Sequence, residues 1–201
     1  MDSYTNEVLL RYHVKYETNT LYKQGIELLK KRGFEIEAII CDGRKGLTEL
    51  YYDIPIQLCQ FHQIQAVTRY LTKNPQLEAG KELYSLTKNL TNISKASFIK
   101  QLSDWKEKWN DFLQERTTLQ PSQKQVFTHR RLRSAYYSLK RNSNWLFTYE
   151  SKKELNIPNT TNAIEGLFSH MKRCLRNHNG LSANNKDKII DGFLEAWPQK
   201  R

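Results

Sequence analysis

The sequence contains few cysteines and no long apolar run. The three cysteines, Cys41, Cys59 and Cys174, are widely spaced, and an odd number of distant thiols argues against a disulfide scaffold and for a reducing compartment. No apolar stretch approaches the roughly 20 residues that a membrane span needs, and the first residues lack the basic and then apolar pattern of a signal peptide. We therefore expect a cytoplasmic protein with no membrane partner.

The charge is strongly unbalanced. Lys and Arg number 32 against 21 Asp and Glu, and the whole excess lies after residue 58. A basic surface favours a polyanionic partner, because each phosphate that a cation contacts releases condensed counterions. The alternative is a basic protein with no nucleic-acid role. With 201 residues, the chain is long enough for one α/β domain that carries a sizeable insertion.

Strand and helix patterns alternate in the first third of the chain. This βαβαβ order predicts an α/β fold in which neighbouring strands are parallel. The expected strands are Val8 to Tyr16, Ile36 to Cys41 and Pro55 to Cys59, and the expected helices begin at Thr18 or Asn19, near Leu47 and near Phe61.

Helical periodicity replaces the strand pattern in the middle of the chain, from about Pro75 to Leu155. The apolar residues of one stripe recur at offsets of three and four, which predicts a buried helix face and not a set of base-stacking side chains. They are Phe98, Leu102, Trp105, Trp109 and Phe112. After a turn at Thr117 to Ser122, we expect a basic helix from Gln123 to Lys140.

Two carboxylates stand at positions suited to metal chemistry. Asp42 follows a buried strand, so we expect it at the carboxyl edge of the sheet, where open α/β folds bind ligands. Glu165 opens a late helix, and if the two acids converge they hold Mg²⁺ or Mn²⁺ and activate water or a DNA 3′-hydroxyl. Each acid has a plainer alternative, because Asp42-Gly43 is a turn sequence and Asn162-x-x-Glu165 is a capping box.

Several motifs occur in an order that is characteristic of one family. They are Lys15-Tyr16-Glu17, Leu21-Tyr22, Gly33-Phe34, Ile40-Cys41-Asp42-Gly43-Arg44, Cys59-Gln60-Phe61-His62 and Asn162-Ala163-Ile164-Glu165-Gly166. From about residue 7 to about residue 195, the chain resembles a bacterial insertion-sequence transposase of the Mutator-like DDE group. The resemblance implies DNA transposition by metal-dependent strand cleavage and transfer at insertion-sequence ends.

The resemblance also implies a domain organisation. Residues 1–72 would form the first part of a ribonuclease H-like core with a mixed sheet, residues 73–156 a large all-helical insertion, and residues 157–201 the closing helix and tail. Such a core holds two Mg²⁺ ions on three acids, of which Asp42 and Glu165 would be two. We expect the chain to lack the opening strands and the first catalytic Asp, so that it cleaves DNA negligibly by itself.

The rival hypothesis is a non-enzymatic truncated transposase that binds double-stranded DNA or the intact enzyme, and a homo-oligomer is a further expectation. Cys59 and His62 resemble half of a zinc site, but we expect Cys59 to end a strand and His62 to lie beside Asp42, either as a support of the acid site or in contact with substrate. Arg130, Arg131 and Arg133 lie in a basic stretch that we expect to contact DNA. Lys172 and Arg176 share a helix edge with Glu165, at about 100° per residue, and are predicted to follow the phosphates away from the metal.

Overall fold

A computed structural model describes residues 1–178 and 180–197, and these residues form two compact units. Unit 1 comprises Met1–Glu37, Lys45–Ile54 and the described residues from Thr161 onward, whereas unit 2 comprises Ala38–Arg44 and Pro55–Thr160. Asn179 and residues 198–201 of the predicted closing segment lie outside the described residues. Within the described part, no helix has the length and apolar character that crossing a membrane requires.

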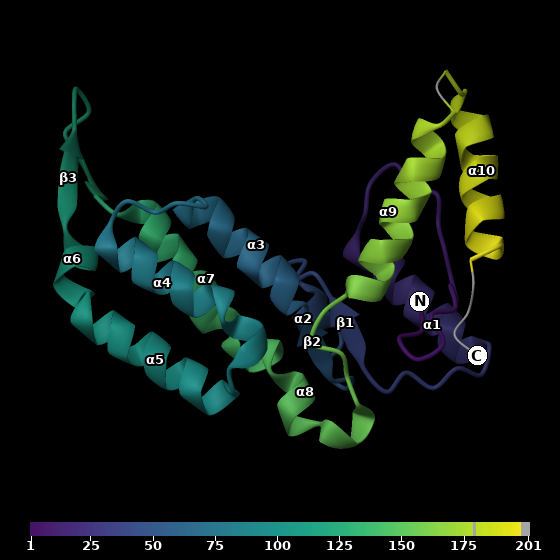
Figure 1. The fold of residues 1–201 in the computed structure, drawn as a ribbon, viewed down its shortest axis with the longest axis horizontal. Helices are drawn as coiled ribbons and strands as arrows, with labels where there is room; N and C mark the ends of the chain where they lie inside the picture. Colours follow the sequence, from purple (N-terminus) through teal and green to yellow (C-terminus); the bar gives the residue numbers. More distant parts are fainter. Residues whose placement is uncertain (179, 198–201) are drawn as a thin grey trace. The chain divides into compact units, whose positions relative to one another are not determined.

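Most of the chain is helical, and the predicted mixed α/β class is confirmed (Figure 1). The elements of unit 1 are α1 (Asn19–Lys31), α2 (Leu47–Leu50), α9 (Asn162–Arg176) and α10 (Ala183–Glu195). The elements of unit 2 are β1 (Ile39–Cys41), β2 (Ile56–Leu58), α3 (Gln60–Leu71), α4 (Glu78–Lys88), the 3₁₀ turn η1 (Leu90–Asn92), α5 (Lys95–Lys108), α6 (Asn110–Gln114), β3 (Arg116–Leu119), β4 (Lys124–Phe127), α7 (Arg130–Leu146), α8 (Thr148–Ser151) and η2 (Lys153–Leu155).

The sheet of unit 2 is a parallel pair. Ile39 lies opposite Ile56 and Cys41 opposite Leu58, so both apolar runs that the sequence marks as strands are confirmed with shorter bounds. All of β2 is buried, as expected for a strand that helices cover. Because no third strand joins this pair among the described residues, the prediction of a mixed sheet is wrong for this part of the chain.

The strand predicted at Val8 to Tyr16 is also wrong. No residue of this segment belongs to a strand, and no backbone hydrogen bond joins it to another described residue. The segment instead packs by its side chains, since a Cβ at Gly25 of α1 would lie 3.2 Å from Leu10 Cδ2, while Arg11 bonds to α10. An alternating pattern favours a strand only where a neighbouring strand supplies a ladder, and this segment has none.

A β-hairpin interrupts the predicted all-helical insertion, which corrects that expectation. Strands β3 and β4 pair antiparallel, with Arg116 opposite Phe127 and Leu119 opposite Lys124. The helix expected from Gln123 therefore begins only at Arg130, where α7 starts. The β-branched residues Thr117, Thr118 and Val126 favour the pleated backbone, and the four residues between the strands supply the turn.

The helices of unit 2 enclose its core. Phe98, Leu102 and Trp105 of α5 are buried, so this part of the predicted aromatic stripe is confirmed as packing surface. The Trp105 ring stacks on Tyr136 of α7 with centroids 5.5 Å apart, and its Nε1 donates to the Ala79 carbonyl of α4 at 3.0 Å. These contacts fix α7 against α4 and α5, and so determine which face of α7 meets solvent.

Candidate functional site

Asp42 lies at the carboxyl edge of the β1–β2 pair, as the sequence predicts. It follows β1 directly, and its side chain is exposed. One carboxylate oxygen, Oδ1, accepts the backbone N–H of Arg44 at 3.2 Å, and Gly43 between them has a φ of +88°. This is the geometry of an Asx turn. Asp42 therefore forms the turn and also presents its carboxylate to solvent.

Cys59 and His62 lie at the same edge. The Cys59 N–H donates to the Cys41 carbonyl at 2.7 Å, which extends the strand pairing by one bond to the start of α3. Cys59 is buried, and His62 is half-buried in the first turn of α3. Burial raises the pKa of the Cys41 thiol, and the neighbouring Asp42 charge raises it further. Asp42, Cys59 and His62 thus all follow the carboxyl ends of the paired strands of unit 2.

Glu165 lies in the first turn of α9 in unit 1. Thr161 is the N-cap residue of α9, so the helix begins at Asn162, one residue earlier than a capping box on Asn162 would require. The Thr161 side chain makes no cap hydrogen bond. A carboxylate in a first turn is stabilised by the helix dipole whatever else it does. Lys172 and Arg176 follow on exposed positions of α9, and neither pairs with a carboxylate among the described residues.

The donor set for a metal is small. Across residues 1–178 and 180–197, no three His, Cys, Asp or Glu side chains gather as a metal site. Asp42 belongs to unit 2 and Glu165 to unit 1, so the convergence of the two acids stays a prediction. A hard divalent cation takes about six oxygen ligands, and the Asp42 carboxylate does not fit such an ion by itself.

The four arginines of α7 divide into two kinds. Arg131 donates to the Arg69 carbonyl of α3, and Arg133 donates to the Leu113 carbonyl at 2.8 Å, so both guanidinium groups also hold neighbouring elements. Arg130 and Arg141 are exposed, and neither has a hydrogen-bond or carboxylate partner in the part of the chain that the structure describes. These two cations are therefore available to a ligand.

The start of α7 carries three arginines and a neighbouring carboxylate, because the N-cap residue His129 bonds through Nε2 to Glu115 Oε2 at 2.9 Å. Arg130, Arg131 and Arg133 crowd its first turn, no acidic residue is present there, and the N-cap residue His129 makes no side-chain cap bond. Each cation near a helix N-terminus costs about 0.3–1 kcal/mol at low ionic strength. Phosphate groups at this end of α7 would reverse the sign of that interaction.

Sequence patterns gave no sign of Tyr70 as a surface residue beside these arginines. Tyr70 near the end of α3 and Tyr137 of α7 are both exposed and border the same hollow as Arg130 and Arg141. Only the packing of α3 against α7 brings these residues together.

Compared with protein-family models, with curated proteins and with solved structures, the chain matches none of them.

Proposed function

We propose that this chain binds double-stranded DNA through the exposed arginines of α7, as a protein of the DDE transposase kind. The observation that carries the proposal is the pair Arg130 and Arg141, two exposed cations of one helix that have no protein partner among the described residues. The same helix, α7, contains no acidic residue. Phosphates are the ligands that such cations contact most often in DNA complexes.

The opposite face of α7 explains why the cations meet solvent. Leu132, Ala135, Tyr136 and Leu139 are buried, so packing against α3 and α5 sets the rotation of the helix. This arrangement supports the prediction that the apolar and aromatic residues of this stretch pack in the core while its arginines contact phosphates. A DNA duplex presents its phosphates without demanding a deep cleft, so a helix face is sufficient.

We also propose that Asp42 and Glu165 are two of the acids of a DDE site. Their positions, at a strand's carboxyl edge and in a helix's first turn, support the assignment. A divalent cation held by such acids supplies Lewis-acid activation of an attacking hydroxyl group. Because the described residues offer too few ligands, we propose that the isolated chain binds DNA and does not cut it.

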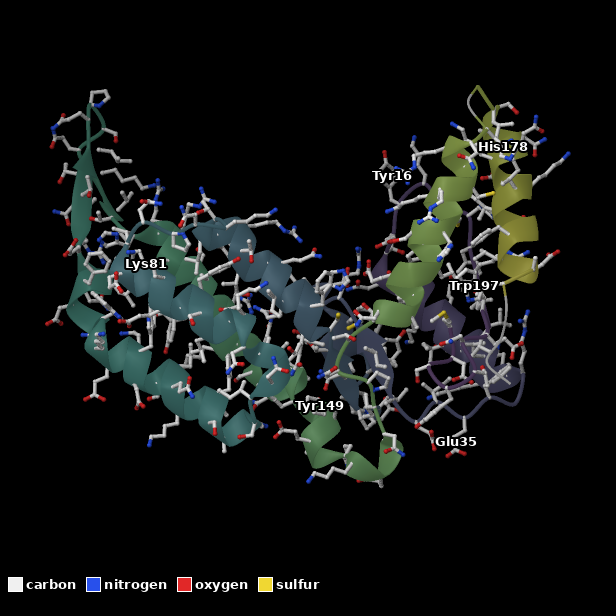
Figure 2. The ribbon with its side chains drawn as sticks, viewed as in Figure 1. Tyr16, Glu35, Lys81, Tyr149, His178 and Trp197 are labelled. Atoms are coloured by element: carbon white, nitrogen blue, oxygen red, sulfur yellow. The ribbon has the colours of Figure 1, made fainter. Side chains whose placement is uncertain are left out.

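Fluorescence anisotropy with a labelled duplex tests the binding proposal. The double variant Arg130→Gln with Arg141→Gln removes two unpaired charges, and the slope of log K against log salt concentration should become shallower by about two. The matched control is Lys81→Gln with Lys108→Gln. Lys81 on α4 (Figure 2) and Lys108 on α5 already pair with Glu78 and Glu82, at 3.2 Å and 2.6 Å. Equal effects of the two double variants would contradict the proposal.

A plasmid-nicking assay in Mg²⁺ or Mn²⁺ tests the second part. We expect the wild-type chain to leave supercoiled DNA intact at concentrations where it binds the plasmid. Strong nicking that Asp42→Asn abolishes would show that the chain assembles a complete acid site, and would refute the non-cleaving assignment.

A further inference from the structure

A hollow of about 430 Å³ opens on unit 2 where the end of α3, the hairpin and α7 meet. Its lining combines three aromatic and three cationic side chains, which are Tyr70, Phe127, Tyr137, Arg130, Arg133 and Arg141. The volume lies within the range of about 300–1,000 Å³ that small-molecule sites occupy.

Two of the three aromatic residues of this hollow are exposed. Tyr70 is 40% and Tyr137 is 42% exposed, whereas Tyr136, the next residue of α7, is 4% exposed. Tyr136 packs against Trp105 in the core, so it helps to hold this turn of α7 against α5. Arg133 lies over the Tyr137 ring at 5.5 Å, and the Tyr136 ring packs against it with centroids 5.0 Å apart. The exposed parts of the Tyr70 and Tyr137 rings are the surfaces on which a planar ligand can stack.

One wall of the hollow is held in place by protein contacts. The Arg133 guanidinium carbon lies 3.6 Å from the centroid of the Phe127 ring, and Arg116 lies over the same ring at 4.2 Å. Arg133 also donates to the Leu113 carbonyl at 2.8 Å. These contacts tie the hairpin to α7, so the hollow is formed before any ligand arrives, which lowers the entropic cost of binding.

We propose that this hollow holds one unpaired nucleotide of a DNA strand, with its base stacked on Tyr70 and Tyr137 and the strand's phosphates on either side of it on Arg130 and Arg141. The proposal rests on the DNA-binding function above and specifies part of the substrate. A fully paired duplex buries its base faces in the helical stack, so it cannot use exposed tyrosine rings. An unpaired base presents a free π-face, and aromatic side chains bind such bases with little sequence preference.

Competition between DNA probes tests the assignment. The probes are a fully paired duplex and the same duplex with one unpaired nucleotide, and the variant is Tyr137→Leu, which keeps an apolar side chain but removes the ring. Stacking on one aromatic ring is worth about 1–3 kcal/mol, so Tyr137→Leu should weaken binding of the unpaired probe by about 5- to 150-fold. Binding of the paired duplex should stay unchanged. Tyr52→Leu, at a tyrosine that is 93% exposed in unit 1, is the control and should affect neither probe.

Photocrosslinking locates the base directly. With 5-iododeoxyuridine at the unpaired position, we expect peptide mass spectrometry to find the crosslink at Tyr70 or Tyr137. If the paired duplex binds but the unpaired probe gains nothing and Tyr137→Leu changes nothing, this inference fails while the proposed function stands. If the wild-type chain binds neither probe, the proposed function fails as well. Equal competition by a poly-glutamate peptide would also overturn the inference, because charge alone would then explain binding.

Discussion

Replacing Gln57 by Leu should destabilise unit 2, because Gln57 connects the sheet to the end of α7. Its side chain is fully buried in β2. Its Nε2 donates to the Leu58 carbonyl at 2.7 Å and to the Leu146 carbonyl at 3.0 Å, and its Oε1 accepts the Tyr149 N–H at 3.0 Å. Leu146 is the last residue of α7 and Tyr149 belongs to α8, so one amide positions both helices.

The expected magnitude follows from which groups lose their partners. The Leu146 carbonyl keeps the Gln60 Nε2 donor at 2.9 Å, so its cost is small. The part-buried Tyr149 N–H loses its acceptor, and a donor left unsatisfied away from water costs about 1–3 kcal/mol. Leucine has nearly the volume of glutamine, so no large cavity forms. We expect Gln57→Leu to lower the free energy of unfolding by about 2 kcal/mol.

Urea unfolding followed by tryptophan fluorescence measures this loss. The control is Gln65→Leu on the exposed face of α3, which should change the free energy of unfolding by less than about 0.5 kcal/mol. Gln57→Leu should also speed amide hydrogen exchange in the last turn of α7. Equal stabilities of the two variants would refute the argument that this buried amide fixes α7 to the sheet.

Three further outcomes are expected. Glu150 accepts the Lys95 N–H at the start of α5 with both carboxylate oxygens, at 3.0 and 3.1 Å, so Glu150→Ala should cost about 1–2 kcal/mol in urea unfolding, and an unchanged midpoint would contradict this. A hydrogen bond to Asp191 at 3.0 Å raises the pKa of His13. That stabilisation is complete below pH about 6.5 and is lost as pH rises through the higher folded-state pKa. His13→Asn should therefore remove this fall in thermal stability above pH about 6.5, whereas His178→Asn should leave it in place. Amides of Val8 to Tyr16, which lack backbone partners among the described residues, should exchange faster than those of α3, and equal protection would reveal an unrecognised ladder.

Local sequence patterns predicted the elements that local physics determines. The offsets from Phe98 to Trp105 are those of a buried helix face, and α5 buries these residues. The apolar run before Asp42 predicted a strand with an acid at its carboxyl edge, and β1 ends as expected. In each case a periodicity of a few residues carries the information.

The elements that depend on distant partners were not predictable in the same way. Val8 to Tyr16 has a strand pattern but no ladder partner, and β4 was hidden in a basic stretch whose residues also suit a helix. The exposure of Tyr70 and Tyr137 depends on how α3 packs against α7, which no single segment encodes. The convergence of Asp42 with Glu165, 123 positions later, depends on long-range packing in the same way and stays a prediction.

Hydrogen exchange in the presence of a short DNA duplex shows whether DNA contacts α7. At the start of α7 the backbone N–H groups of Arg130 and Arg131 precede the first helical hydrogen bond, which Arg133 makes to the His129 carbonyl at 3.0 Å. If DNA lies along the exposed arginines, exchange should slow in residues 127–134 and stay unchanged in α5. Unchanged exchange in residues 127–134, under conditions where the duplex is bound, would show that DNA does not lie along the exposed arginines of α7.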